Sequence, residues 1–159
     1  MAHRSRLPAH SLRIINNQSS VISNQFWQQM LSDPGFGQLP TIRKMTDAEL
    51  QLRIRRCESF LVAADGQFLG ILSSNKYMTE SIMNEYGSYG SKYSSTSIFN
   101  QYSRYGNQYD QLSPFNQYSQ TPPRIFLRGN IVGYLSANRN LPNYLDPHKI
   151  FDFIYNNGL

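Results

Sequence analysis

The sequence predicts an α+β fold in which two related β-hairpins form a small antiparallel sheet around a set of tyrosine-rich repeats. Three observations predict this. A phrase of the type Ser-Ile-x-Asn-x-Tyr begins at Ser81 and Ser97, and again in the altered form Ser-Pro-x-Asn-x-Tyr at Ser113, at a spacing of 16 residues. Strand–turn–strand patterns flank these repeats on both sides. Short amphipathic helices are expected at both ends of the chain, so a sheet with helical cover is the predicted architecture.

Composition limits the class of protein. The chain has 159 residues, of which 40% are hydrophobic and 16% charged, which favours one folded domain with extensions over a disordered chain. The single cysteine, Cys57, excludes an internal disulfide and a zinc site built from cysteines. His3, His10 and His148 are scattered without companions at ligand spacing, so no metal and no other cofactor is expected. The sequence has no apolar run long enough for a secretory signal or a membrane span, and we expect a cytoplasmic protein.

The N-terminal part is predicted to be an arm followed by a helical region. Residues 1–18 have no hydrophobic period and carry basic residues, which is typical of a flexible arm. In the helical region, residues 19–59, Ile22 and Phe26 are four residues apart and predict a short amphipathic helix with Trp27 beside them. Trp27 either docks on the body of the domain or contacts a partner.

A second helix is expected to start at Thr46, because Thr46-Asp47-Ala48-Glu49 has the pattern of a capping box. Helical spacing continues through Leu50, Ile54, Cys57 and Leu61, which predicts a buried stripe, and we expect Cys57 to be a small core residue.

The net charge of +5 is concentrated in the first 56 residues, which contain eight basic and three acidic side chains. Basic residues around the second helix are therefore candidates for contact with an anion or a nucleic acid, the alternative being an ordinary solvated helix face. The candidates are Arg43, Lys44, Arg53, Arg55 and Arg56.

Residues 60–145 are predicted to form the hairpin–repeat–hairpin domain. Asp65-Gly66 separates two apolar runs, and Arg128-Gly129-Asn130 does the same 63 residues later. Gly70 and Gly133 occupy equivalent strand positions, where the missing side chain would allow another group to approach closely. Residues 146–159 should form a C-terminal helix with Asp146 as N-cap.

The repeats combine helical spacing with a composition that opposes a helix. Serine, glycine, asparagine and threonine in residues 81–96 disfavour a helix by about 5 kcal/mol relative to alanine. We expect each unit to be a short turn followed by irregular Gly-Tyr loops, in which Asn and Ser side chains satisfy the backbone.

Tyrosine amid serine, glycine and asparagine is also the composition of antibody binding loops. The tyrosines either pack on one another and on the hairpins, or contact a protein, a sugar or single-stranded bases. Residues 76–110 carry no net charge, which disfavours nucleic acid at the repeats. The candidate partner-binding residues are Trp27, Tyr86, Tyr89, Tyr93, Tyr102, Tyr105 and Tyr109.

The pattern from Asp65-Gly66 through Leu72-Ser73-Ser74-Asn75-Lys76-Tyr77 into the repeat units resembles a set of uncharacterised bacterial proteins with Tyr, Asn and Gly repeats. The resemblance spans about residues 60–145. It implies a recurrent domain and carries no activity, and this sequence departs from the pattern at Asn107 and Asp110.

The sequence lacks a phosphate-binding glycine loop and a nucleophile elbow, and it has few carboxylates. We therefore expect a protein that is not an enzyme; in an enzyme, Asp65, Asp110 and Asp146 would be the acids to test. The predicted function is a macromolecular interaction or scaffold module with a protein partner. The alternatives are a nucleic-acid accessory protein acting through the basic N-terminal region and a carbohydrate-binding domain acting through exposed tyrosines.

Overall fold

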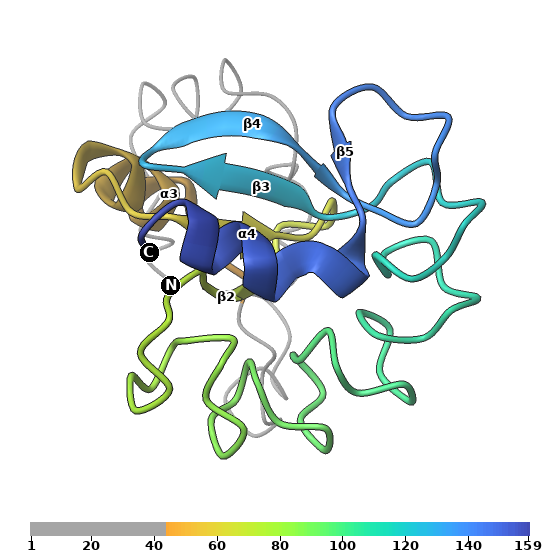
Figure 1. The fold of residues 1–159 in the computed structure, drawn as a ribbon, viewed down its shortest axis with the longest axis horizontal. Helices are drawn as coiled ribbons and strands as arrows, with labels where there is room; N and C mark the ends of the chain where they lie inside the picture. Colours follow the sequence, from red (N-terminus) through yellow and green to blue (C-terminus); the bar gives the residue numbers. More distant parts are fainter. Residues whose placement is uncertain (1–43) are drawn as a thin grey trace, which may run out of the picture. The chain divides into compact units, whose positions relative to one another are not determined.

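The computed structural model of the protein describes residues 44–159 (Figure 1). The chain divides after Arg43 into two units, and the described residues are the second of them. The predictions for the arm at 1–18, for the helix containing Trp27 and for Arg43 lie outside the described residues.

Five strands form one sheet in the order β2-β1-β3-β4-β5. β1 pairs with β2 across the Asp65-Gly66 turn, β3 pairs with β4 across the Arg128-Gly129 turn, and β1 and β3 join these pairs edge to edge, all antiparallel. The strands are β1 (Phe60–Val62), β2 (Phe68–Ile71), β3 (Arg124–Leu127), β4 (Asn130–Leu135) and β5 (Tyr144–Leu145). The α+β class with a small sheet is therefore as predicted.

The sheet is mixed, which corrects the prediction of a purely antiparallel one. β5 pairs parallel with β4, with Tyr134 opposite Tyr144 and Leu135 opposite Leu145. Gly133 makes this possible, because a Cβ atom at this position would lie 1.9 Å from the carbonyl oxygen of Asn143. The predicted close approach at Gly133 is thus confirmed, and at Gly70 a Cβ atom would lie 2.6 Å from Ile82.

The two faces of the sheet are covered differently, as the alternation of side chains along a strand requires. One face carries Phe60, Phe68 and Phe126, with the rings of Phe60 and Phe126 stacked at 4.6 Å between centroids. Helix α3 (Asp47–Arg55) packs Leu50 and Ile54 against this cluster.

The other face holds the larger core. Leu61 and Ile125 from the strands meet Ile150 and Ile154 of helix α4 (Ile150–Asn156) in one buried cluster. Side chains from the segment between β2 and β3 enter the same cluster, among them Ile82, Ile98 and Tyr105. Figure 1 shows this segment as a succession of lobes that curves around α4.

Helix α3 begins as predicted and ends earlier than its hydrophobic spacing suggested. The Thr46 side chain accepts a hydrogen bond from the Glu49 amide, and the Glu49 carboxylate accepts one from the Thr46 amide. At the other end Cys57 has φ of 53° and lies exposed, which corrects its prediction as a core residue. The physical reason is a left-handed helix cap: the amide of Cys57 bonds to the Ile54 carbonyl and that of Glu58 to the Arg53 carbonyl.

The C-terminal helix begins where the sequence placed it. The side chain of Asp146 accepts a hydrogen bond from the His148 amide, and a 3₁₀ turn, η1 (Pro147–Lys149), leads into α4. Ile150 and Ile154 are fully buried and attach the helix to the core.

Candidate functional site

The segment between β2 and β3 is a ribbon of consecutive turns with a regular step. Backbone amides bond to carbonyls three residues earlier, as from Asn84 to Ser81 and from Asn100 to Ser97. Once in each of the first two 16-residue units the step is four residues, from Ser91 to Gly87 and from Asn107 to Ser103. Each of these two units therefore contains four steps of three residues and one step of four.

Serine and asparagine side chains close these turns with the same bonds in each unit. The Oγ atom of the opening serine accepts a hydrogen bond from the amide two residues later; the pairs are Ser81 with Met83, Ser97 with Phe99 and Ser113 with Phe115. The Oδ1 atom of the asparagine does the same; the pairs are Asn84 with Tyr86, Asn100 with Tyr102 and Asn116 with Tyr118. The asparagine Nδ2 atom donates to a carbonyl six residues earlier, at Met78, Ser94 and Asp110.

The expectation that Asn and Ser side chains satisfy the backbone is thus confirmed. The structure differs from the expectation in one respect, because the loops are regular. Regularity follows from the small polar side chains that stand at nearly every step of the ribbon and bond locally, with Gly87 as an exception.

This ribbon presents a row of outward-pointing tyrosines. In each case the tyrosine amide is bound by the side chain of the residue two positions earlier, an Asn or a Ser. The side chains are between 74% and 98% exposed. We call this set the tyrosine row: Tyr77, Tyr86, Tyr93, Tyr102, Tyr109 and Tyr118.

Two of the predicted partner-binding tyrosines point inward and do not belong to the row. Tyr105 is only 3% exposed and donates a hydrogen bond to Asp65, and Tyr89 is half-buried with its ring edge-on to Phe68. Burial, together with nearby carboxylates, raises the pKa of both phenols. The following glycines, Gly90 and Gly106, allow this packing, since a Cβ atom on either would lie 2.2 Å from a backbone carbonyl oxygen.

Tyr77 and Tyr118 are exposed members of the row that were absent from the predicted site. The signal that identifies them is the spacing Asn-x-Tyr, at Asn75-Lys76-Tyr77 and at Asn116-Gln117-Tyr118. Tyrosines preceded two positions earlier by asparagine point outward, whereas tyrosines directly followed by a buried glycine point inward.

The predicted basic cluster is largely occupied by ion pairs within the described residues. Arg53 pairs with Glu58 at 2.7 Å and with Glu80 at 2.9 Å, and its guanidinium lies 4.0 Å from the Phe68 ring centre. Partial burial lowers the pKa of Arg53, but the hydrogen bonds and charges of Glu80 and Glu58 outweigh it and raise the pKa overall. Lys44 lies 3.4 Å from Asp65.

Arg55 and Arg56 are the exposed members of the basic cluster. Arg56 is 3.9 Å from Glu58, and Arg55 forms no ion pair with another described residue. Arg53 therefore acts as a structural link between α3 and the start of the turn ribbon, and the described cationic surface here is small.

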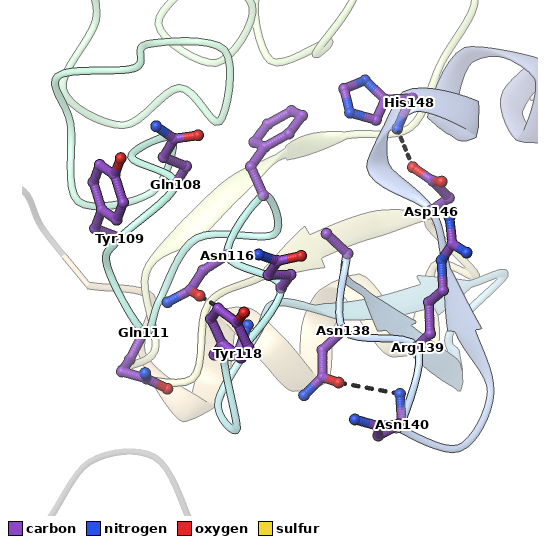
Figure 2. Close-up of a pocket in the computed structure, with 13 residues that line it drawn as sticks. Gln108, Tyr109, Gln111, Asn116, Tyr118, Asn138, Arg139, Asn140, Asp146 and His148 are labelled. Carbon is purple, nitrogen blue, oxygen red and sulfur yellow. Dashed lines mark hydrogen bonds between the residues drawn. The ribbon is translucent and has the colours of Figure 1, made fainter.

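A groove lies at the C-terminal end of the row, with a volume of about 1040 Å³. One wall is formed by the last turns, between Gln108 and Tyr118, and the other by residues 137–140 together with Asp146 and His148. Figure 2 shows Tyr109 and Gln108 on one side, with Arg139, Asp146 and His148 on the other. We call this feature the C-terminal groove.

The three candidate acids have structural partners. Asp65 accepts the Tyr105 hydrogen bond, Asp110 caps a turn by accepting from the Leu112 amide, and Asp146 caps η1. Within residues 44–159, no three His, Cys, Asp or Glu side chains are grouped so that they could hold a metal ion. No helix in that range has the length and apolarity needed to cross a membrane.

Comparison with known proteins finds no matching family model, no matching curated protein and no matching solved structure. The function must therefore be argued from the turn ribbon and its surface.

Proposed function

We propose that the protein is a non-enzymatic interaction module whose tyrosine row binds a protein partner. The observation that supports the proposal most directly is the exposure of six tyrosines, each on a turn whose backbone is fixed by side-chain hydrogen bonds. In this proposal the two related hairpins and the three 16-residue units serve as the scaffold.

The energetics of association favour such an arrangement. Binding costs free energy when loops and side chains become ordered, and a turn that is already fixed reduces that cost. A tyrosine side chain has few rotatable bonds, a large apolar ring and a hydroxyl for hydrogen bonding, which is why tyrosine is enriched in binding surfaces. Six such side chains on fixed turns provide a contact surface at a low entropic cost.

The residues that precede the tyrosines help to define the partner. Lys76, Glu85 and Lys92 alternate in sign, and the remaining three positions are glutamines: Gln101, Gln108 and Gln117. A phosphate backbone requires a surplus of positive charge along its track. These six positions together carry a net charge of only +1, too small for such a track, which supports a protein partner over nucleic acid.

Site-specific photocrosslinking in the native host tests the proposal. The photoreactive residue p-benzoylphenylalanine replaces Tyr86, Tyr93, Tyr102 or Tyr109 one at a time, and Asn130, exposed at the start of β4, serves as the control position. We expect the four row positions to crosslink to the same protein and position 130 to remain free of it. Crosslinks that are equally abundant at position 130, or that disappear after nuclease treatment, contradict the proposal.

A second arm uses substitutions that leave the backbone bonds intact. Replacing Tyr86, Tyr93, Tyr102 and Tyr109 together by serine removes the rings but keeps the Asn and Ser caps that hold the turns. We expect the captured protein to be lost while the melting temperature stays close to that of the wild type. The matched control, four Tyr→Phe substitutions at the same positions, should retain most of the binding, because the rings provide the contact area.

A further inference from the structure

The C-terminal groove is preformed, because hydrogen bonds join its two walls. The amide of Ala137 donates to the Pro114 carbonyl at 2.7 Å, and the Asn138 Nδ2 atom donates to the Ser119 carbonyl at 2.9 Å. Asn138 also accepts from the Asn140 amide, so the same buried side chain shapes the far wall. A ligand would therefore meet fixed walls, which lowers the cost of binding.

The lining combines aromatic rings with side-chain amides. Tyr109, Tyr118 and Phe115 contribute rings, and Phe115 is held edge-on against His148 at 5.4 Å between ring centroids. Gln108, Gln117 and Asn140 are exposed and contribute amides. A side-chain amide both donates and accepts hydrogen bonds, as a sugar hydroxyl does, and an aromatic ring offers an apolar face for the C–H groups of a sugar ring.

The charge of the lining and the volume of the groove limit the class of ligand further. Arg139 and Asp146 provide one positive and one negative side chain, so the lining has no surplus for a polyanion. Small-molecule pockets usually occupy about 300–1,000 Å³ and are predominantly apolar. The C-terminal groove is slightly larger than that range and rich in amides, which favours an extended polar ligand over a compact apolar one.

From these features we infer that the C-terminal groove binds a neutral oligosaccharide of several sugar units. This site is separate from the protein-binding role proposed for the row, although Tyr109 and Tyr118 belong to both surfaces. The two roles are tested with different ligands, so that one can fail while the other holds.

The test begins with the full-length protein on a glycan array that contains neutral and anionic oligosaccharides, followed by calorimetry with the strongest neutral oligosaccharide. We expect saturable binding to a neutral oligosaccharide and no preference for the sulfated or uronic-acid probes. The inference is overturned if the array gives no neutral hits or anionic hits alone. It is also overturned if calorimetry detects no binding of the neutral oligosaccharide at millimolar concentrations.

Two equivalent tyrosines provide a matched pair of variants. Tyr118→Ala removes a ring from the groove, whereas Tyr86→Ala removes the tyrosine at the same position of the first unit, held by the same Asn–amide bond. We expect Tyr118→Ala to weaken oligosaccharide binding at least tenfold and Tyr86→Ala to leave it unchanged. Gln117→Ala, which removes an exposed amide with no expected effect on folding, should weaken binding by a smaller factor. Equal losses in the Tyr118 and Tyr86 variants contradict a site in the groove.

Discussion

The hydroxyl of Tyr105 donates a hydrogen bond of 3.0 Å to the carboxylate of Asp65, which lies 40 residues earlier in the chain. Asp65 belongs to the turn between β1 and β2, and Tyr105 belongs to the second repeat unit. The bond therefore fastens the turn ribbon to the sheet. Lys44 contacts the same carboxylate oxygen at 3.4 Å and brings the start of the described unit to this point.

Stability should fall at alkaline pH because of this tyrosine. Burial, and then the charge and hydrogen bond of Asp65, raise the pKa of Tyr105 above its ordinary value of 10. Below pH 10 the phenol is protonated in both states; above it the unfolded form ionises first, so stability is lost as pH rises toward the folded-state pKa. The expected slope is about 1.4 kcal/mol per pH unit, measured by urea unfolding between pH 8 and pH 11.

The variant Tyr105→Phe isolates this contribution. It should cost about 1–2 kcal/mol at pH 8, where the hydrogen bond to the carboxylate is lost, and it should unfold with a shallower alkaline slope than the wild type. Tyr102→Phe, at an exposed position of the row, is the control and should match the wild type. Identical slopes in all three proteins would show that Tyr105 is not the titrating group.

Cys57 is predicted to be a site of stabilisation. A side chain with φ of 53° is strained, and glycine relieves that strain at a left-handed helix cap. Cys57→Gly should raise the free energy of unfolding by about 1 kcal/mol, as measured by denaturant titration. Cys57→Ala removes the thiol but keeps the Cβ atom, so it should give no gain; an equal gain in both variants would assign the effect to the thiol.

Gly106 should not tolerate a side chain. A Cβ atom there would lie 2.2 Å from the carbonyl oxygen of Asn100, and Gly90 has the same relationship to Asn84 one unit earlier. Alanine at either position should destabilise the protein by about 1–3 kcal/mol, by similar amounts if the units are structurally equivalent. Thermal unfolding gives the comparison, with Ser95→Ala at an exposed position as the neutral reference.

The asparagine caps can be tested by removing their two hydrogen bonds separately. Asn100 is buried, accepts from the Tyr102 amide and donates to the Ser94 carbonyl. Asn100→Ala should cost about 1–3 kcal/mol in the free energy of unfolding, because two partly buried backbone groups lose their partner. Asn100→Asp retains the acceptor, loses the donor and places a carboxylate oxygen beside the Ser94 carbonyl. A smaller cost than that of alanine would therefore show that the acceptor bond stabilises the turn, and a cost below about 0.5 kcal/mol for alanine would contradict a stabilising role for the cap.

Local signals predicted much of the fold. The capping box at Thr46, the Asp65-Gly66 turn and the N-cap at Asp146 each depend on residues within one turn of each other, and the structure has them where the sequence placed them. Composition correctly excluded a helix across the repeats, because side chains that bond to nearby backbone compete with helical hydrogen bonds.

Non-local contacts explain what sequence reasoning missed. The parallel strand β5 depends on the close approach of the Asn143 backbone to Gly133, which has no side chain. No local sequence pattern indicates this contact. The apolar spacing of the helix continues through Cys57, but Cys57 itself adopts the left-handed conformation that ends the helix. This position usually holds glycine, so the sequence contains no stop signal there. Whether a tyrosine points inward or outward depends on its position within the 16-residue unit. The prediction treated all the repeat tyrosines as one set and so combined the inward-pointing Tyr89 and Tyr105 with the exposed row.

The 16-residue period of the turns determines which side chains of the ribbon face the core and which face outward. A deletion of one residue within a unit would shift every later side chain relative to the core and turn the following tyrosines to the wrong side. Loss or gain of a whole 16-residue unit leaves the inward and outward positions of the later residues unchanged. Each complete unit supplies two exposed tyrosines, such as Tyr102 and Tyr109. The number of binding side chains on this surface can thus change by duplication in increments of two, and a chain with one more unit would have eight tyrosines in the row instead of six.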